Sequence, residues 1–147
     1  MKSRITVFTK WMLDFMFYTG ILVTLTLPLT VYIFFYEKVY GWYYTCLLLL
    51  FAVSGVLALL VIWELRKMFR TVLADDCFVE ENVVSLRRMG TYSFLIAVVW
   101  CWRVCLYATP ASGVVILVFV IAGLFSKVLS QVFDRAVIYK RENDLTI

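Results

Sequence analysis

The sequence predicts an all-α polytopic membrane protein, on the evidence of its composition, its four long apolar stretches and the placement of its cationic residues. Of the 147 residues, 64% are hydrophobic and 16% are charged. Soluble domains average about 45–50% apolar and about 25% charged residues, and a soluble domain of this length cannot bury so much apolar surface. The composition therefore excludes a soluble globular fold, a disordered chain and a nucleic-acid-binding domain built on a basic surface.

Four stretches of the chain are candidates for membrane-spanning helices, which need about 20 apolar residues to cross roughly 30 Å of hydrocarbon. They lie at about 11–36, 42–63, 91–107 and 111–133. Pro28 removes a backbone donor and predicts a kink in the first span, and small residues beside it would let a neighbouring helix approach closely: Gly20, Thr24, Thr26 and Thr30. The uncharged run at 108–113 predicts a tight turn between the last two spans. We therefore predict one four-helix membrane domain over residues 1–147.

The cationic residues predict how this domain is oriented, because Lys and Arg accumulate on the cytoplasmic side of a membrane. One predicted side carries eleven of them: Lys2, Arg4, Lys10, Arg66, Lys67, Arg70, Arg87, Arg88, Arg135, Lys140 and Arg141. The opposite side carries only Lys38. Both termini, a helical loop at 65–89 and a tail at 134–147 are therefore predicted to be cytoplasmic.

Three ionisable residues fall inside the predicted spans. Arg103 is expected about 10 Å short of the outer interface, where its side chain could snorkel, pair internally, or bind an anion or substrate in a cavity. Lys127 and Asp14 are expected at a shared depth near the inner boundary. Snorkelling would satisfy Lys127 and pairing with Lys10 would satisfy Asp14, or the two could form an ion pair between helices.

Small residues recur at every fourth position of the last span, at Ala122, Ser126 and Ser130. Such a stripe allows close helix contact, either within the helix bundle or in a homodimer.

Enzymatic chemistry is not indicated by the sequence. The chain has no histidine, the commonest general base and metal ligand, and it has no glycine-rich phosphate-binding loop. Its four cysteines lack the Cys-x-x-Cys spacing of a zinc site, so we predict no metal, cofactor or catalytic residue. Small apolar packing is expected of the membrane cysteines, and a disulfide between Cys46 and Cys105 stays open.

The segment CFVEENVVSLRRMG, residues 77–90, has the pattern of an amphipathic helix. Its apolar stripe comprises Val79, Val83, Leu86 and Gly90. Acidic residues open the segment and basic residues close it, which complements the helix dipole. The helix could lie on the membrane surface or dock a soluble partner.

The chain ending, residues 141–147, could fray or fold back onto this segment. We predict the second arrangement, with Leu145 and Ile147 covering Phe78 or Val83. Arg87 or Arg88 would then meet Glu142 or Asp144.

These two segments resemble the bacterial membrane family known as domain of unknown function 2975. The family patterns Phe-x-x-Glu-Asn-x-x-x-Leu-Arg-Arg and Glu-Asn-Asp-Leu-Thr-Ile/Val are matched by Phe78, Glu81, Asn82, Leu86, Arg87 and Arg88, and by Glu142, Asn143, Asp144, Leu145, Thr146 and Ile147. Relatives often carry Pro and Ser or Thr where this chain has Cys77 and Val79, so the helix start lacks that proline and that N-cap.

The resemblance implies four spans, a location in the bacterial inner membrane and a small cytoplasmic helix-turn-helix regulator as partner. We expect a non-enzymatic module that contacts membrane lipid and binds no nucleic acid directly. Its partner surface would comprise Phe78, Glu81, Asn82, Leu86, Arg87, Arg88, Glu142, Asn143, Asp144, Leu145 and Ile147. The alternative is a small transporter or channel-like subunit using Arg103, which a polar cavity at that residue would favour over a closed, dry bundle.

Overall fold

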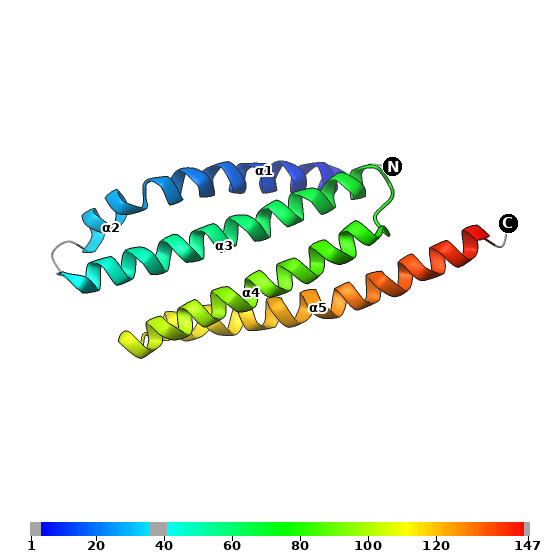
Figure 1. Ribbon diagram of the computed structural model, residues 1–147. Coiled ribbons are helices and arrows are strands. Elements are labelled where there is room, and N and C mark those ends of the chain that lie inside the picture. Colours follow the sequence, from blue (N-terminus) through cyan, green and yellow to red (C-terminus); the bar gives the residue numbers. More distant parts are fainter. Residues whose placement is uncertain (1–3, 36–40, 146–147) are drawn as a thin grey trace.

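The computed structural model describes residues 4–35 and 41–145, and within these ranges it is entirely helical (Figure 1). The helices are α1 (Arg4–Leu25), α2 (Leu27–Phe35), α3 (Trp42–Leu73), α4 (Glu80–Leu106) and α5 (Pro110–Leu145). The all-α prediction is confirmed. No soluble domain stands apart from the helices in the described part of the chain.

The long helices lie side by side in a row, in the order α1, α3, α4, α5, and each runs antiparallel to its neighbour (Figure 1). Contacts join α1 to α3, α3 to α4 and α4 to α5, while α2 touches α1 and α3. Within the described ranges, α1 makes no backbone contact with α4 or α5. The described long helices therefore form an open row and do not close into a four-helix bundle.

Three helices are long and apolar enough to cross a membrane: Tyr44–Leu73, Glu80–Leu106 and Pro110–Leu145. A fourth span exists if α1 and α2 act as one, since Arg4–Leu25 and Leu27–Ile33 are joined with a bend of 65°. The kink expected from Pro28 is present, and the break falls at Thr26, within one turn of the proline. Threonine hydroxyls bond back onto the helix here, with Thr24 Oγ1 2.7 Å from the Gly20 carbonyl oxygen.

Small residues let neighbouring helices approach closely, as the sequence predicted. A Cβ atom on Gly20 would lie 2.8 Å from the Leu59 side chain of α3. On α5, Ser126 and Ser130 are buried, and because α5 contacts only α4 among the described helices, their stripe packs within the chain.

One end of the helices, taken along their axes, is named here for use below. The loop 74–79, the start of α1 and the end of α5 all lie at this end (Figure 1), and we call it the charged end. At about 1.5 Å per residue, the 32 residues of α3 reach about 48 Å and the 36 residues of α5 about 54 Å. Both lengths exceed the roughly 30 Å of bilayer hydrocarbon, so these helices are longer than a crossing requires.

The helix boundaries decide one alternative and correct one expectation at this end. Residues 80–90 are the first turns of α4 and continue unbroken into its apolar part, which argues against the alternative of a separate helix on the membrane surface. The chain ending does not fold back, because α5 continues to Leu145, whose side chain is 86% exposed. Ile147, which was to share that cover, lies outside the described residues.

Candidate functional site

The loop at the charged end is fastened by a buried amide. Asn82 is 1% exposed, and its Nδ2 donates to Thr71 Oγ1 and to the Cys77 carbonyl oxygen, both at 2.7 Å. The N-cap residue Val79 makes no side-chain cap, as the sequence indicated. The hydrogen bonds of Asn82 instead connect the first turn of α4 to the last turns of α3 and to the loop. Asn82 therefore has a structural role in holding this loop.

The apolar stripe of the same segment packs inward. Val83 is 2% exposed and Leu86 4%, so neither side chain is available to a partner in this conformation. Of the proposed partner surface, Asn82 and Leu86 thus serve the interior of the helix row.

Ionic and aromatic contacts fasten α5 to the loop and to α4. Lys140 Nζ pairs with the Asp76 carboxylate, and Arg141 Nη2 lies 2.9 Å from Glu80 Oε2. Below them, the rings of Phe78 and Phe133 meet edge to face with centroids 5.5 Å apart. Lys140 lies beyond the apolar part of α5, and its hydrogen bond to Asp76 raises its pKa above the usual value. The Lys140 ammonium therefore stays charged at neutral pH.

A buried carboxylate lies between α3 and α4. Glu64 is 4% exposed, with Lys67 Nζ 3.0 Å from its Oε2 and Arg88 Nη1 3.7 Å from its Oε1. The Lys67 contact lacks hydrogen-bond geometry, since Glu64 Oε2 accepts no hydrogen bond from the described residues. Arg88 was expected to reach the chain ending, but it is directed to α3 instead.

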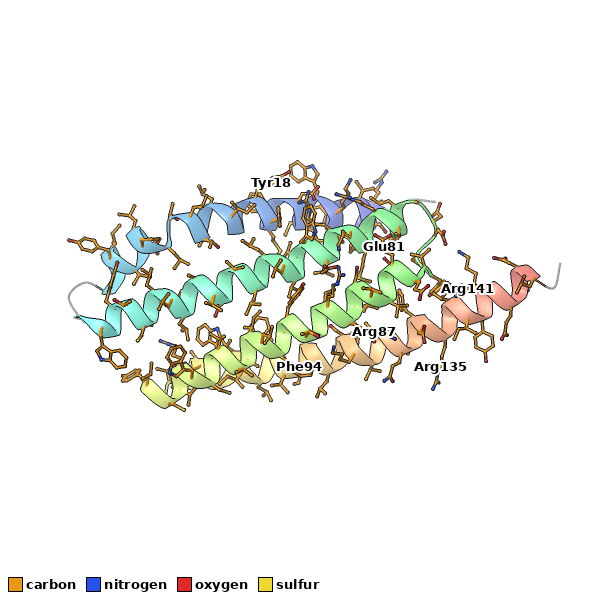
Figure 2. The ribbon with its side chains drawn as sticks, viewed as in Figure 1. Tyr18, Glu81, Arg87, Phe94, Arg135 and Arg141 are labelled. Carbon is orange, nitrogen blue, oxygen red and sulfur yellow. The ribbon has the colours of Figure 1, made fainter. Side chains whose placement is uncertain are left out.

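The exposed residues at the charged end come from the start of α4 and the end of α5. Glu81, Arg87, Arg135 and Arg141 all lie nearer this end than Phe94 does in Figure 2. Exposed residues of the predicted partner surface are Phe78, Glu81, Arg87, Arg88, Glu142, Asn143, Asp144 and Leu145. The acidic residues near the end of α5 make no ion pair with Arg87 or Arg88.

An ion pair in an aromatic cage joins α1 to α3. Arg66 Nε donates to Asp14 Oδ1 at 2.8 Å, and the guanidinium carbon lies 4.6 Å from the ring centre of Phe17. The ring centres of Tyr18 and Trp63 lie 5.5 and 5.7 Å from the same carbon, and Figure 2 shows the position of Tyr18 on α1. The expected pairing of Asp14 with Lys127 or Lys10 is wrong. The nearby aromatic residues were a signal for the cage, but the sequence did not indicate which cation fills it.

Lys127 is satisfied by α4 rather than by a carboxylate. Its Nζ lies 3.0 Å from the Arg87 carbonyl oxygen and 2.9 Å from Thr91 Oγ1. The side chain thus crosses the seam between α5 and α4.

Arg103 lies in the last turn of α4, and its side chain contacts the first turn of α5. Its Nη1 donates to Ser112 Oγ at 2.8 Å, and its guanidinium carbon lies 5.2 Å from the ring centre of Trp100. Ser112 is fully buried and shares a 2.7 Å hydrogen bond with Thr109. Arg103 therefore has an internal partner, one of the alternatives that the sequence left open. Nearby Cys105 is free, as is Cys46, so no disulfide joins them.

Comparison with known families gives one match: the model of the family described as Protein of unknown function (DUF2975) matches residues 21–147. That range begins within α1 and includes both segments that carried the resemblance. Neither a curated protein nor a solved structure matched the chain.

Proposed function

The chain belongs to the DUF2975 family, and from this premise we propose that it is a non-enzymatic integral membrane module that binds a cytoplasmic partner through its charged end. The proposed topology has four spans, with α1 and α2 forming the first, and both termini in the cytoplasm of a bacterial cell. The eleven-to-one distribution of Lys and Arg supports this orientation.

The observation that carries the proposal is that α3, α4 and α5 are each longer than the helix needed to cross the hydrocarbon layer. These extensions are packed against one another and are fastened by Asn82 and by the Arg141–Glu80 and Lys140–Asp76 ion pairs. A surface that is ordered before binding loses less conformational entropy when a partner docks. The charged end thus has the rigidity expected of a docking platform.

The exposed chemistry at the end of α5 favours a basic partner. Glu142 and Asp144 are exposed beside Leu145, which is 86% exposed. DNA-binding proteins carry basic faces that such carboxylates complement. This agrees with the small helix-turn-helix regulator that the family resemblance implies.

Partner capture tests this proposal. The tagged full-length protein, solubilised in mild detergent, should retain a regulator that mass spectrometry identifies. Purified regulator should then bind the Glu142→Lys/Asp144→Lys variant at least tenfold more weakly. Arg70→Gln, which changes an exposed charge on α3, is the control and should bind normally. Equal binding by the variant and the wild type would contradict the proposed surface.

Cysteine labelling tests the orientation separately. In a background without the native cysteines, an impermeant reagent added to intact cells should label a probe cysteine placed at Tyr40 but not one at Ser3 or Thr146. Labelling of either end from outside would contradict the topology.

A further inference from the structure

Lys127 is fixed across α4 by the absence of a side chain at Gly90. A Cβ atom on Gly90 would lie 3.0 Å from Lys127 Cε and 3.1 Å from Cδ, so the glycine leaves room for the lysine stem. The ammonium then donates to the Arg87 carbonyl oxygen and to Thr91 Oγ1. An ammonium carries three donors, which leaves one N–H without a protein acceptor among these contacts.

The Arg87 guanidinium lies on the same part of α4 and is exposed. Several cations at the charged end face a carboxylate, as Arg66, Lys140 and Arg141 do. Neither Arg87 nor Lys127 forms an ion pair with any residue of 4–35 or 41–145. The fold thus holds a lysine against the backbone of an arginine with no carboxylate to offset the two charges.

The depth of these two cations matches that of lipid headgroups. Counted from the turn between α4 and α5, at about 1.5 Å per residue, Lys127 lies about 26 Å along α5 and Arg87 about 28 Å along α4. The hydrocarbon layer is roughly 30 Å thick, so both cations reach its boundary on the side of the charged end. In Figure 2, Arg87 lies closer to the charged end than Phe94 does.

Between these two cations and the turn that joins α4 to α5, the helices expose an apolar surface. On α4, Leu95 and Val98 continue the face of Thr91 and are 45% and 65% exposed. On α5, Leu124 precedes Lys127 by three residues and is 55% exposed. This apolar seam is suited to an acyl chain that descends from a headgroup held by the cations.

We propose that the α4–α5 seam binds an anionic phospholipid, with the phosphate held by the Arg87 guanidinium and the Lys127 ammonium and an acyl chain lying along Leu95 and Leu124. Apolar surface alone would accept any lipid, but two uncompensated cations at headgroup depth select a negative charge. The inference rests on the membrane location given under the proposed function, but it does not depend on the protein partner.

Lipid titration of the full-length protein in neutral detergent tests the site. The probes are phosphatidylglycerol and phosphatidylcholine carrying the same fluorescent acyl chain. We expect phosphatidylglycerol to bind at least fivefold more tightly, and Arg87→Gln to reduce its affinity about fivefold. Arg70→Gln removes the same charge from α3 and should leave the affinity unchanged.

A second variant tests the lysine without removing charge. Gly90→Ala places a methyl group against the Lys127 stem, so it should also lower the preference for phosphatidylglycerol. Equal affinities of the wild type for the two lipids, or equal losses in Arg87→Gln and Arg70→Gln, would overturn the proposal. Displacement of phosphatidylglycerol by millimolar inorganic phosphate would assign the cations to a free anion and would also overturn it.

The experiments separate this inference from the partner proposal. A protein that captures its regulator but shows no lipid preference refutes only the lipid site, whereas the reverse result refutes only the docking surface.

Discussion

Replacing Asn82 is expected to open the loop at the charged end. Its amide donates two 2.7 Å hydrogen bonds, one to the Thr71 hydroxyl and one to the Cys77 carbonyl oxygen, and the residue is 1% exposed. Asn82→Ala removes both bonds and leaves the Cys77 oxygen without this donor. At about 1 kcal/mol for each of the two bonds, the local opening free energy should fall by about 2 kcal/mol.

Limited proteolysis measures this change directly. Chymotrypsin cleaves after aromatic residues, and Phe78 lies in the loop and is 44% exposed. If cleavage follows the population of the opened loop, a loss of about 2 kcal/mol should accelerate it about thirtyfold. Asn82→Asp should cleave at least as fast at neutral pH, because the new carboxylate would face the Cys77 carbonyl oxygen. Its effect should lessen in acid, where protonation restores a donor.

The neighbouring exposed residue supplies the control. Glu81→Gln should change the cleavage rate by less than about threefold, since substitutions on a solvated surface usually cost under about 0.5 kcal/mol. A cleavage rate for Asn82→Ala equal to that of this control would refute the assignment of Asn82 as the residue that fastens the loop.

Three further predictions concern the seams between helices. Gly123→Ala should destabilise the protein in detergent by about 1–3 kcal/mol, because its Cβ would lie 2.8 Å from a ring on α4. The control is Gly113→Ala, which has open space around it and should be neutral or stabilising. Equal melting temperatures for the two variants would contradict the close approach of α4 and α5 at Gly123. A double-mutant cycle of Asp14→Asn and Arg66→Gln should give a coupling of about 1 kcal/mol or more, and additive effects would show that the two side chains do not stabilise each other. Arg103→Leu should alter the free energy of unfolding by less than about 1 kcal/mol, because an intramembrane arginine is itself costly. A larger loss of stability in thermal unfolding would show that the turn between α4 and α5 depends on Arg103. Loss of a solute flux into vesicles would support the transporter alternative.

Local features of the sequence predicted the helices and the kink well. Apolar length alone identified the long helices, because a chain in hydrocarbon must satisfy its backbone within each segment. The bend near Pro28 was also predictable, since a missing N–H acts on its own helix regardless of the neighbours. The apolar stripe with Val83 and Leu86 also followed from helical periodicity, but its burial within the helix row was not predicted.

Partners across helices were harder to predict. The pairing of Asp14 with Arg66 depends on α1 lying beside α3, and helix order is absent from the hydrophobic pattern. For Lys127 the sequence left snorkelling and an ion pair with Asp14 open, whereas its acceptors are a carbonyl oxygen and a threonine hydroxyl that Gly90 leaves accessible. The continuation of α5 through residues 141–145 could have been predicted, since that segment contains no glycine or proline to end a helix.

The open row of helices also determines how the molecule comes apart. Each outer helix is held by a single long seam, and α1 contributes nothing to the seam between α4 and α5. Loss of the α1–α3 seam therefore leaves the α4–α5 hairpin with all of its own contacts, as in repeat proteins whose units stabilise only their neighbours. We expect stepwise dissociation under increasing detergent stress, in which α1 separates from α3 first while the α4–α5 hairpin persists as a separately cooperative unit.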